Sequence, residues 1–194
     1  MHLATSPASL RETGFTLLEV LIALLVVASV AMGVAQLFAL TMIATENSRH
    51  ETSSTTLAVQ KMEELRGLTW SFAPGGGALS DVSTNLSTDP ATTAGPGLSV
   101  SPAGTLSTST SGYVDYLDGR GRWVGTGTGL PPGVVYIRRW SIEALQSDPD
   151  TLVFQVLVTT VRRDREAAAA GGNRQRRRGD ALLTTFRTRK AAHS

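Results

Sequence analysis

One uninterrupted apolar stretch limits what this chain can fold into. Residues 20–45 form a run of 26 residues without a charged side chain. As a helix, at about 1.5 Å per residue, the run would be about 39 Å long, and the hydrocarbon core of a bilayer is about 30 Å thick. Its apolar side chains would lie on all sides, which excludes a one-sided amphipathic helix. The apolar part of a cleaved secretory signal has only about 7–15 residues, so the sequence predicts a retained membrane-spanning helix.

A single carboxylate stands at the start of this stretch. Glu19 is the fifth residue of the apolar tract that begins at Phe15. A carboxylate inside or at the edge of a membrane is costly and usually has a function. The simpler alternative is an acidic residue at the start of a helix, where the helix dipole favours negative charge.

The residues around Glu19 carry a resemblance to a known family. The segment GFTLLEVLIALLVV (14–27) closely resembles the N-terminal signature of type IV prepilins and type II secretion pseudopilins. The resemblance implies that a prepilin peptidase cuts between Gly14 and Phe15, which removes the leader of residues 1–14, and then methylates the new amino group of Phe15. It also implies that Glu19 supports methylation and pairs with the N-terminal amine of a neighbouring subunit. A looser likeness continues to TTLAVQKMEELRGL (55–68), which is similar to PilV-type minor pilins.

Beyond the assembly helix of residues 15–45, the sequence predicts that the helix continues through residues 46–68. Leu57, Ala58, Met62, Leu65 and Leu68 fall near i, i+4, i+8 spacing and form one apolar stripe. Gly67 is a plausible C-terminal stop, and the basic Arg66 before it suits the negative end of a helix. His50 stands in a polar stretch and is predicted to be a solvated surface residue.

The remainder divides into a low-complexity segment and a β-rich segment. Residues 69–112 are dominated by Gly, Ser, Thr and Pro, a composition that predicts a long loop or partial disorder. Residues 113–190 contain β-branched and aromatic runs separated by turn residues, which predicts a small antiparallel sheet with one face packed on the helix. The fold class is therefore α+β, the architecture that the pilin resemblance also implies. The predicted strands are 113–117, 122–124, 134–143, 151–161 and 181–188.

An Arg-rich loop is predicted at residues 162–179. A basic segment of this kind can bind nucleic acid or anionic lipid through phosphate contacts. The alternative is a solvated loop whose charges keep the protein soluble, and no aromatic side chain between Phe154 and Phe186 is present for base stacking. The residues that could contact nucleic acid are Arg162, Arg163, Arg174, Arg176, Arg177 and Arg178.

No pattern in the sequence predicts catalysis. The chain has no cysteine, which excludes thiolate chemistry and Cys-ligated metals. The three histidines lack metal-ligand spacing, and the glycine-rich residues 125–129 lack the Lys-Ser/Thr of a phosphate-binding loop. We therefore expect no enzymatic activity, no cofactor and no metal.

The sequence predicts a structural minor pilin or pseudopilin that assembles through its N-terminal helix into, or at the tip of, a type IV pilus-like filament. By resemblance, its partners are prepilin peptidase, other pilin subunits, the inner-membrane assembly platform and the lipid bilayer. The expected location is the inner membrane with a single span and the head outside the cytoplasm, and then the pilus or cell surface; Arg11 in the leader favours this orientation. Three alternatives stay open: a type II secretion pseudopilin, a competence pilin that binds DNA through the Arg-rich loop, and an ordinary single-pass membrane protein that stays uncleaved.

Overall fold

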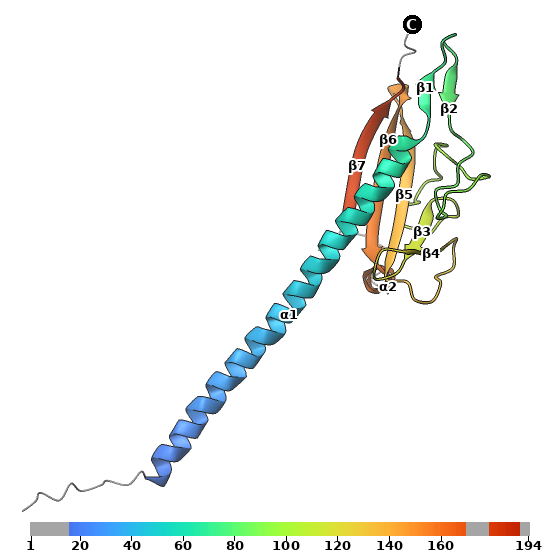
Figure 1. Cartoon of the computed structure of the whole chain (residues 1–194). Helices are drawn as coiled ribbons and strands as arrows, with labels where there is room; N and C mark the ends of the chain where they lie inside the picture. The colour runs from blue at the N-terminus through green and yellow to red at the C-terminus, as the bar shows by residue number, and fades with distance from the viewer. Residues whose placement is uncertain (1–15, 170–178, 191–194) are drawn as a thin grey trace, which may run out of the picture. The chain divides into compact units, whose positions relative to one another are not determined.

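The computed structural model describes residues 16–169 and 179–190. Its contacts divide the chain into two compact units, Met1–Thr45 and Glu46–Ser194, and the second is called the head below. One helix, α1 (Leu17–Gly67), begins in the first unit and ends in the second (Figure 1). Gly14 and Phe15, on which the predicted cleavage and methylation fall, lie outside the described residues.

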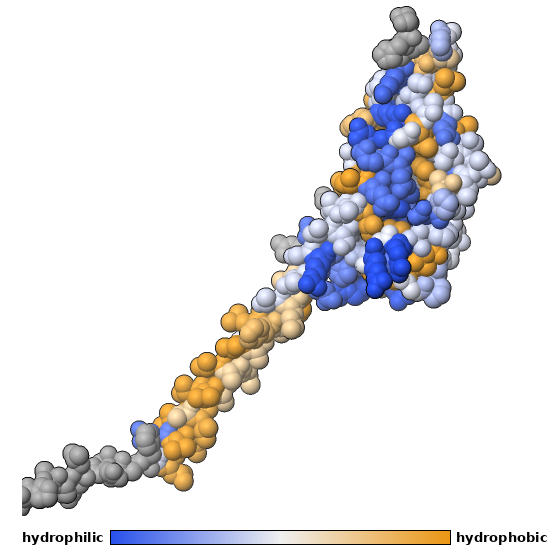
Figure 2. Space-filling view, viewed as in Figure 1, coloured by the Kyte–Doolittle hydropathy of each residue, from blue (hydrophilic) through white to orange (hydrophobic). Residues whose placement is uncertain are grey.

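The first unit consists, over its described residues, of the apolar part of α1. Large apolar side chains are exposed all along it, from Leu17 to Ile43, and Figure 2 shows the apolar surface that they form. Among the described residues, α1 is the one helix long and apolar enough to cross a membrane. This is the helix that the charge-free run predicts, and none of its side chains between residues 17 and 45 is buried by the described part of the chain.

The head contains a five-stranded sheet in which every neighbouring pair is antiparallel, in the order β4-β3-β5-β6-β7. These pairings confirm the predicted antiparallel sheet (Figure 1). The strand 181–188 was predicted with its observed bounds, whereas β6 begins at Asp148, inside the predicted turn, because the chain reverses at residues 146–147. The strands are β3 (Val114–Leu117), β4 (Trp123–Thr126), β5 (Tyr136–Leu145), β6 (Asp148–Thr160) and β7 (Ala181–Thr188).

The second half of α1 packs on one face of this sheet. Four of the five stripe residues are buried, and Leu68 packs against the same cluster while partly exposed. Opposite them, Trp140 and Ile142 of β5 and Phe154 of β6 are almost completely buried. The predicted helix continuation and its apolar stripe are thus confirmed, and the long apolar helix packed against an antiparallel sheet gives an α+β, pilin-like architecture. The buried stripe residues are Leu57, Ala58, Met62 and Leu65.

The low-complexity segment has more structure than its composition predicted. It contributes a hairpin of β1 (Trp70–Phe72) and β2 (Ala78–Ser80), and it buries Leu86 and Leu98 in the main core. The expectation of loop or partial disorder is wrong for these parts, because a few apolar side chains find partners on the sheet. At the other end of the sheet, residues 162–169, predicted as part of the Arg-rich loop, belong to the helix α2 (Val161–Ala169), which also includes the last residue of the predicted strand 151–161.

Candidate functional site

The start of α1 is organised by a capping interaction. The carbonyl of Thr16 accepts hydrogen bonds from the backbone N–H groups of Glu19 and Val20, at 3.0 and 3.2 Å. The Thr16 hydroxyl also accepts from the Glu19 N–H at 3.3 Å. Thr16 and Glu19 are three residues apart, the spacing of a capping box, which satisfies N–H groups that the first helical turn leaves open. The Thr16 and Glu19 spacing is visible in the sequence itself.

Glu19 lies in the first turn of α1, with its side chain exposed. From Leu17 to Thr45 it is the only charged residue. Its carboxylate is therefore favoured by the helix dipole, as the simpler alternative holds, and it is also accessible to a cation from another molecule. The two interpretations do not exclude each other.

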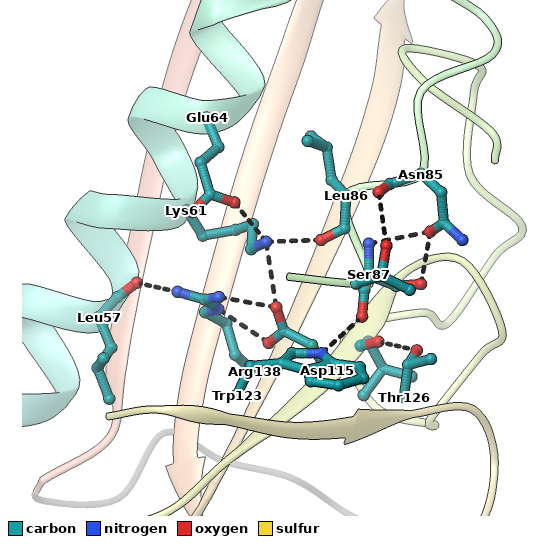
Figure 3. A network of polar contacts seen from close by, with 12 residues as sticks. Leu57, Lys61, Glu64, Asn85, Leu86, Ser87, Asp115, Trp123, Thr126 and Arg138 are labelled. Atoms are coloured by element: carbon teal, nitrogen blue, oxygen red, sulfur yellow. Dashed lines mark hydrogen bonds and ion pairs between the residues drawn. The ribbon is translucent and has the colours of Figure 1, made fainter. Parts of the chain in front are cut away.

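A second polar arrangement, which the sequence analysis missed, joins α1 to the sheet (Figure 3). Asp115 of β3 accepts two hydrogen bonds from Arg138 of β5, at 2.9 and 2.7 Å, and lies 3.1 Å from the Lys61 ammonium of α1. Lys61 also donates to Glu64 at 2.5 Å and to the Leu86 carbonyl at 2.7 Å. Three of these ionic residues, Lys61, Asp115 and Arg138, are almost fully buried, with 1%, 1% and 3% of their surface exposed. We call Lys61, Glu64, Asp115 and Arg138 the buried ionic cluster.

The buried ionic cluster has a structural role, because it connects α1 to the sheet. The third guanidinium bond of Arg138 goes to the Leu57 carbonyl of α1 at 3.1 Å, so both cations connect the helix to the sheet. A cavity of about 90 Å³ adjoins the cluster, but the donors of Lys61 and Arg138 that face it already have partners. A buried charge is strongly destabilising when its partner is removed, because it is then left uncompensated. The cluster therefore holds the sheet against the second half of α1, and both of its cations already have partners.

His50 is not the solvated residue that the sequence predicted. Its Nδ1 lies 2.9 Å from the Tyr136 hydroxyl of β5, and the two rings meet edge to face at 5.8 Å between centroids. The side chain is half-buried. The prediction was wrong because the polar neighbours of His50 along the chain do not show that Tyr136 lies beside it in the fold.

The Arg-rich segment separates into residues with different roles. Arg162 is exposed on α2, but Arg163 keeps only 8% of its surface exposed, donates to Asn47 of α1 at 3.2 Å and lies 4.0 Å from Asp180. A guanidinium held in this way is not available to a phosphate backbone. The other residues predicted to contact nucleic acid lie outside the described residues: Arg174, Arg176, Arg177 and Arg178.

The acidic residues near the β3–β4 turn serve local structure. Asp118 accepts backbone hydrogen bonds from Arg120 and Arg122, at 2.8 and 3.0 Å, and the bond from the Arg122 N–H leads the interactions that lower the pKa of this carboxyl. Asp115, which the sequence places three residues earlier, belongs to the buried ionic cluster instead. Within residues 16–169 and 179–190, no group of three or more His, Asp or Glu side chains is arranged to hold a metal ion.

Comparison with protein families gives one match. Residues 10–35 match the prokaryotic N-terminal methylation motif, which spans the predicted cleavage site and Glu19. The N-terminus therefore carries a prepilin-type cleavage and methylation motif, and the match covers 26 of the 194 residues. The motif agrees with the prediction of a structural pilin-like protein rather than an enzyme. The match ends before residues 55–68, so the narrower likeness to PilV-type minor pilins stays a prediction. Searches of curated proteins and of solved structures returned no match.

Proposed function

We propose that the protein is a pilin or pseudopilin subunit that a prepilin peptidase cleaves after Gly14 and methylates at Phe15, and that then assembles through α1 into a type IV pilus-like filament. The observation that carries the proposal is the methylation motif over residues 10–35, which overlaps the first half of α1, a helix with exposed apolar side chains on all sides up to Ile43. A minor, priming or tip position in the filament is the form we favour.

The chemistry of Glu19 supports assembly through the N-terminus. A carboxylate at the centre of a membrane helix costs on the order of 2.5–3.5 kcal/mol on insertion scales, and less near the interface. The amine at Phe15 of a neighbouring copy or of a related subunit would supply the opposite charge. Pairing with this amine would relieve the cost of the unpaired carboxylate, and this relief would favour the association of two subunits.

The experiment replaces Glu19 by Val and measures recovery of partner pilins from membranes together with cleavage after Gly14. We expect cleavage to persist and partner recovery to fall. Thr41→Val, on the same helix, is the control, because it also replaces a polar side chain in the span without removing a charge. Normal partner recovery and normal filament incorporation with Glu19→Val would remove the assembly role of Glu19.

The proposed orientation places the leader in the cytoplasm and the head outside it. Arg11 in the leader, and the one helix among the described residues that is long and apolar enough to cross a membrane, support this orientation. A reporter that is active only in the cytoplasm, fused at Ser194, should be silent, and an active reporter would contradict the orientation.

The DNA-binding alternative rests on Arg162 and on the arginines outside the described residues. A gel shift with the head, repeated across a salt series, tests it, because binding through phosphates weakens steeply as salt rises. Secretion and competence systems remain alternatives to the pilus for the same subunit.

A further inference from the structure

The short helix α2 is fixed at one end of the sheet, directly after the end of β6 (Figure 1). The N–H of Val161, its first residue, donates to the Val135 carbonyl at 3.0 Å, and the Val161 side chain packs against a small apolar cluster on the sheet. Asp164 of α2 accepts a hydrogen bond from Arg139 of β5 at 2.8 Å. Because α2 is held by these contacts, its exposed side has a fixed direction in the head.

The same helix lies beside the part of α1 that follows the charge-free run. Arg163 of α2 donates to Asn47 at 3.2 Å, and Asn47 is two residues after Thr45, where the run ends. The helical rise from Glu19 to Asn47 is about 42 Å, and a bilayer with its headgroups is about 40–45 Å thick. With Glu19 at one membrane surface, α2 therefore lies at the level of the lipid headgroups on the other.

Three exposed arginines at this end of the head have no partner among the described residues. Arg162 and Arg165 are exposed on α2, and Arg49 is exposed on α1, two residues after Asn47. Arg162 and Arg165 are three residues apart, so they lie on one side of α2. Most of the other described arginines form an ion pair with an Asp or Glu side chain. The three guanidinium groups are thus open to a ligand from outside the chain.

We propose that Arg49, Arg162 and Arg165 bind the phosphate groups of anionic phospholipids in the bilayer that α1 spans. A guanidinium group has five N–H donors in a planar fork, which binds phosphate through paired hydrogen bonds. Lipid is favoured over nucleic acid because the chain itself brings α2 to the headgroups, and α2 has no aromatic side chain for base stacking. The proposal rests on α1 as a membrane span, and it requires neither cleavage nor filament assembly.

The contacts with lipid are local, because this end of the head is not uniformly basic. Glu46 and Glu51 are exposed on α1, and Glu166 is exposed on α2. A broad positive field is therefore not what attracts the membrane; single arginines bind single phosphates. Since the arginines come from both α1 and α2, these contacts hold the head against the membrane surface in one orientation.

The absence of cysteine allows a fluorophore to be attached at one chosen site. Ala168→Cys places it on the exposed side of α2, and Ala78→Cys is the matched control on β2, at the other end of the sheet. The full chain is reconstituted in vesicles of phosphatidylethanolamine mixed with either phosphatidylglycerol or phosphatidylcholine. The vesicles also contain a lipid with a spin label on its headgroup, which quenches the fluorophore on close approach. Resistance to alkaline extraction shows whether α1 is inserted.

We expect stronger quenching at Ala168→Cys with phosphatidylglycerol than with phosphatidylcholine, and little quenching at Ala78→Cys with either lipid. Replacing the three arginines by glutamine should remove this difference, because each basic residue near an anionic surface strengthens binding about fivefold. A second triple variant removes the same charge at the other end of the head and should keep the difference. The first variant combines Arg49→Gln, Arg162→Gln and Arg165→Gln, and the second combines Arg66→Gln, Arg187→Gln and Lys190→Gln.

Three results would overturn the proposal. An inserted chain with equal quenching in both kinds of vesicle, or one that keeps its preference for phosphatidylglycerol without the three arginines, would exclude the lipid contact and leave the membrane span intact. A DNA gel shift that requires the three arginines, with quenching that does not, would assign these residues to nucleic acid. A chain that alkaline extraction removes from the vesicles would contradict the span itself, and the lipid contact with it.

Discussion

Removing the negative charge at the centre of the buried ionic cluster should destabilise the head strongly. Asp115→Asn keeps the size of the side chain but leaves Lys61 and Arg138, both almost completely buried, without the carboxylate that they share. Breaking a buried ion pair by removing one partner costs about 3–5 kcal/mol, because the remaining charge stays buried and uncompensated. Glu64 remains within 2.5 Å of Lys61 but is 34% exposed in its side chain, so it compensates only one of the two cations in part.

The measurement is chemical and thermal unfolding of the head, residues 46–194, whose core residues all lie within that range. For a domain of this size, the predicted loss corresponds to a fall in Tm on the order of 10 °C. Glu63→Gln is the matched control: it makes the same kind of change in the exposed pair between Glu63 and Arg66, which should contribute at most about 1 kcal/mol. A second variant replaces Lys61, Asp115 and Arg138 together by apolar residues of similar size, and it should recover much of the loss.

A stability of Asp115→Asn within about 0.5 kcal/mol of the original protein, comparable with an ordinary surface substitution, would refute this reasoning. It would mean that the two cations reach water or other carboxylates when Asp115 is neutral. The buried ionic cluster would then contribute little to holding α1 against β3 and β5.

Three further predictions concern the head. A hydrogen bond from the Thr84 hydroxyl leads the interactions that hold the pKa of the Asp81 carboxyl below 3.8. The ionised Asp81 carboxylate therefore stabilises the head above pH 3.8, and this stabilisation is lost as the pH falls through the lowered pKa. In urea titrations, the difference in unfolding free energy between the original protein and Asp81→Asn should shrink between about pH 5 and pH 2. Tyr136→Phe removes the hydroxyl that bonds His50 and should cost about 0.5–1.5 kcal/mol by the same titration, an effect that should vanish in a His50→Phe background. Leu65→Ala should cost about 2–5 kcal/mol, whereas Val59→Ala on the exposed side of α1 should change the unfolding free energy by at most about 0.5 kcal/mol.

The features that the sequence predicted are those set by neighbours along the chain. Each of these features follows from a local sequence pattern, and each is present in the structure. They are the long helix α1, the buried apolar stripe on its second half, and the strand β7 at residues 181–188. The sequence prediction of a loop is wrong at the helix α2, whose alanines are good helix formers, because a basic composition does not distinguish a loop from an exposed helix.

The features that the sequence did not predict join residues far apart in the chain. Lys61, Asp115 and Arg138 lie on three elements, and nothing near any one of them indicates its two partners. The same holds for the low-complexity segment, where the indole N–H of Trp123 donates to the Ser87 carbonyl and that of Trp70 to the Asp150 carbonyl. Composition describes how much apolar surface a segment has, but not which partners the rest of the fold supplies.

The central claim is that the protein is a prepilin-type subunit, and the most direct measurement is mass spectrometry of its N-terminus after extraction from membranes of a strain that contains the processing peptidase. The account predicts a mature chain that begins at Phe15 and carries a methyl group on its amine. Gly14→Val should leave the chain uncut, because a branched side chain occupies the position where the motif has glycine. A chain that retains residues 1–14, or one cut elsewhere, would contradict the account and leave α1 as an ordinary membrane anchor.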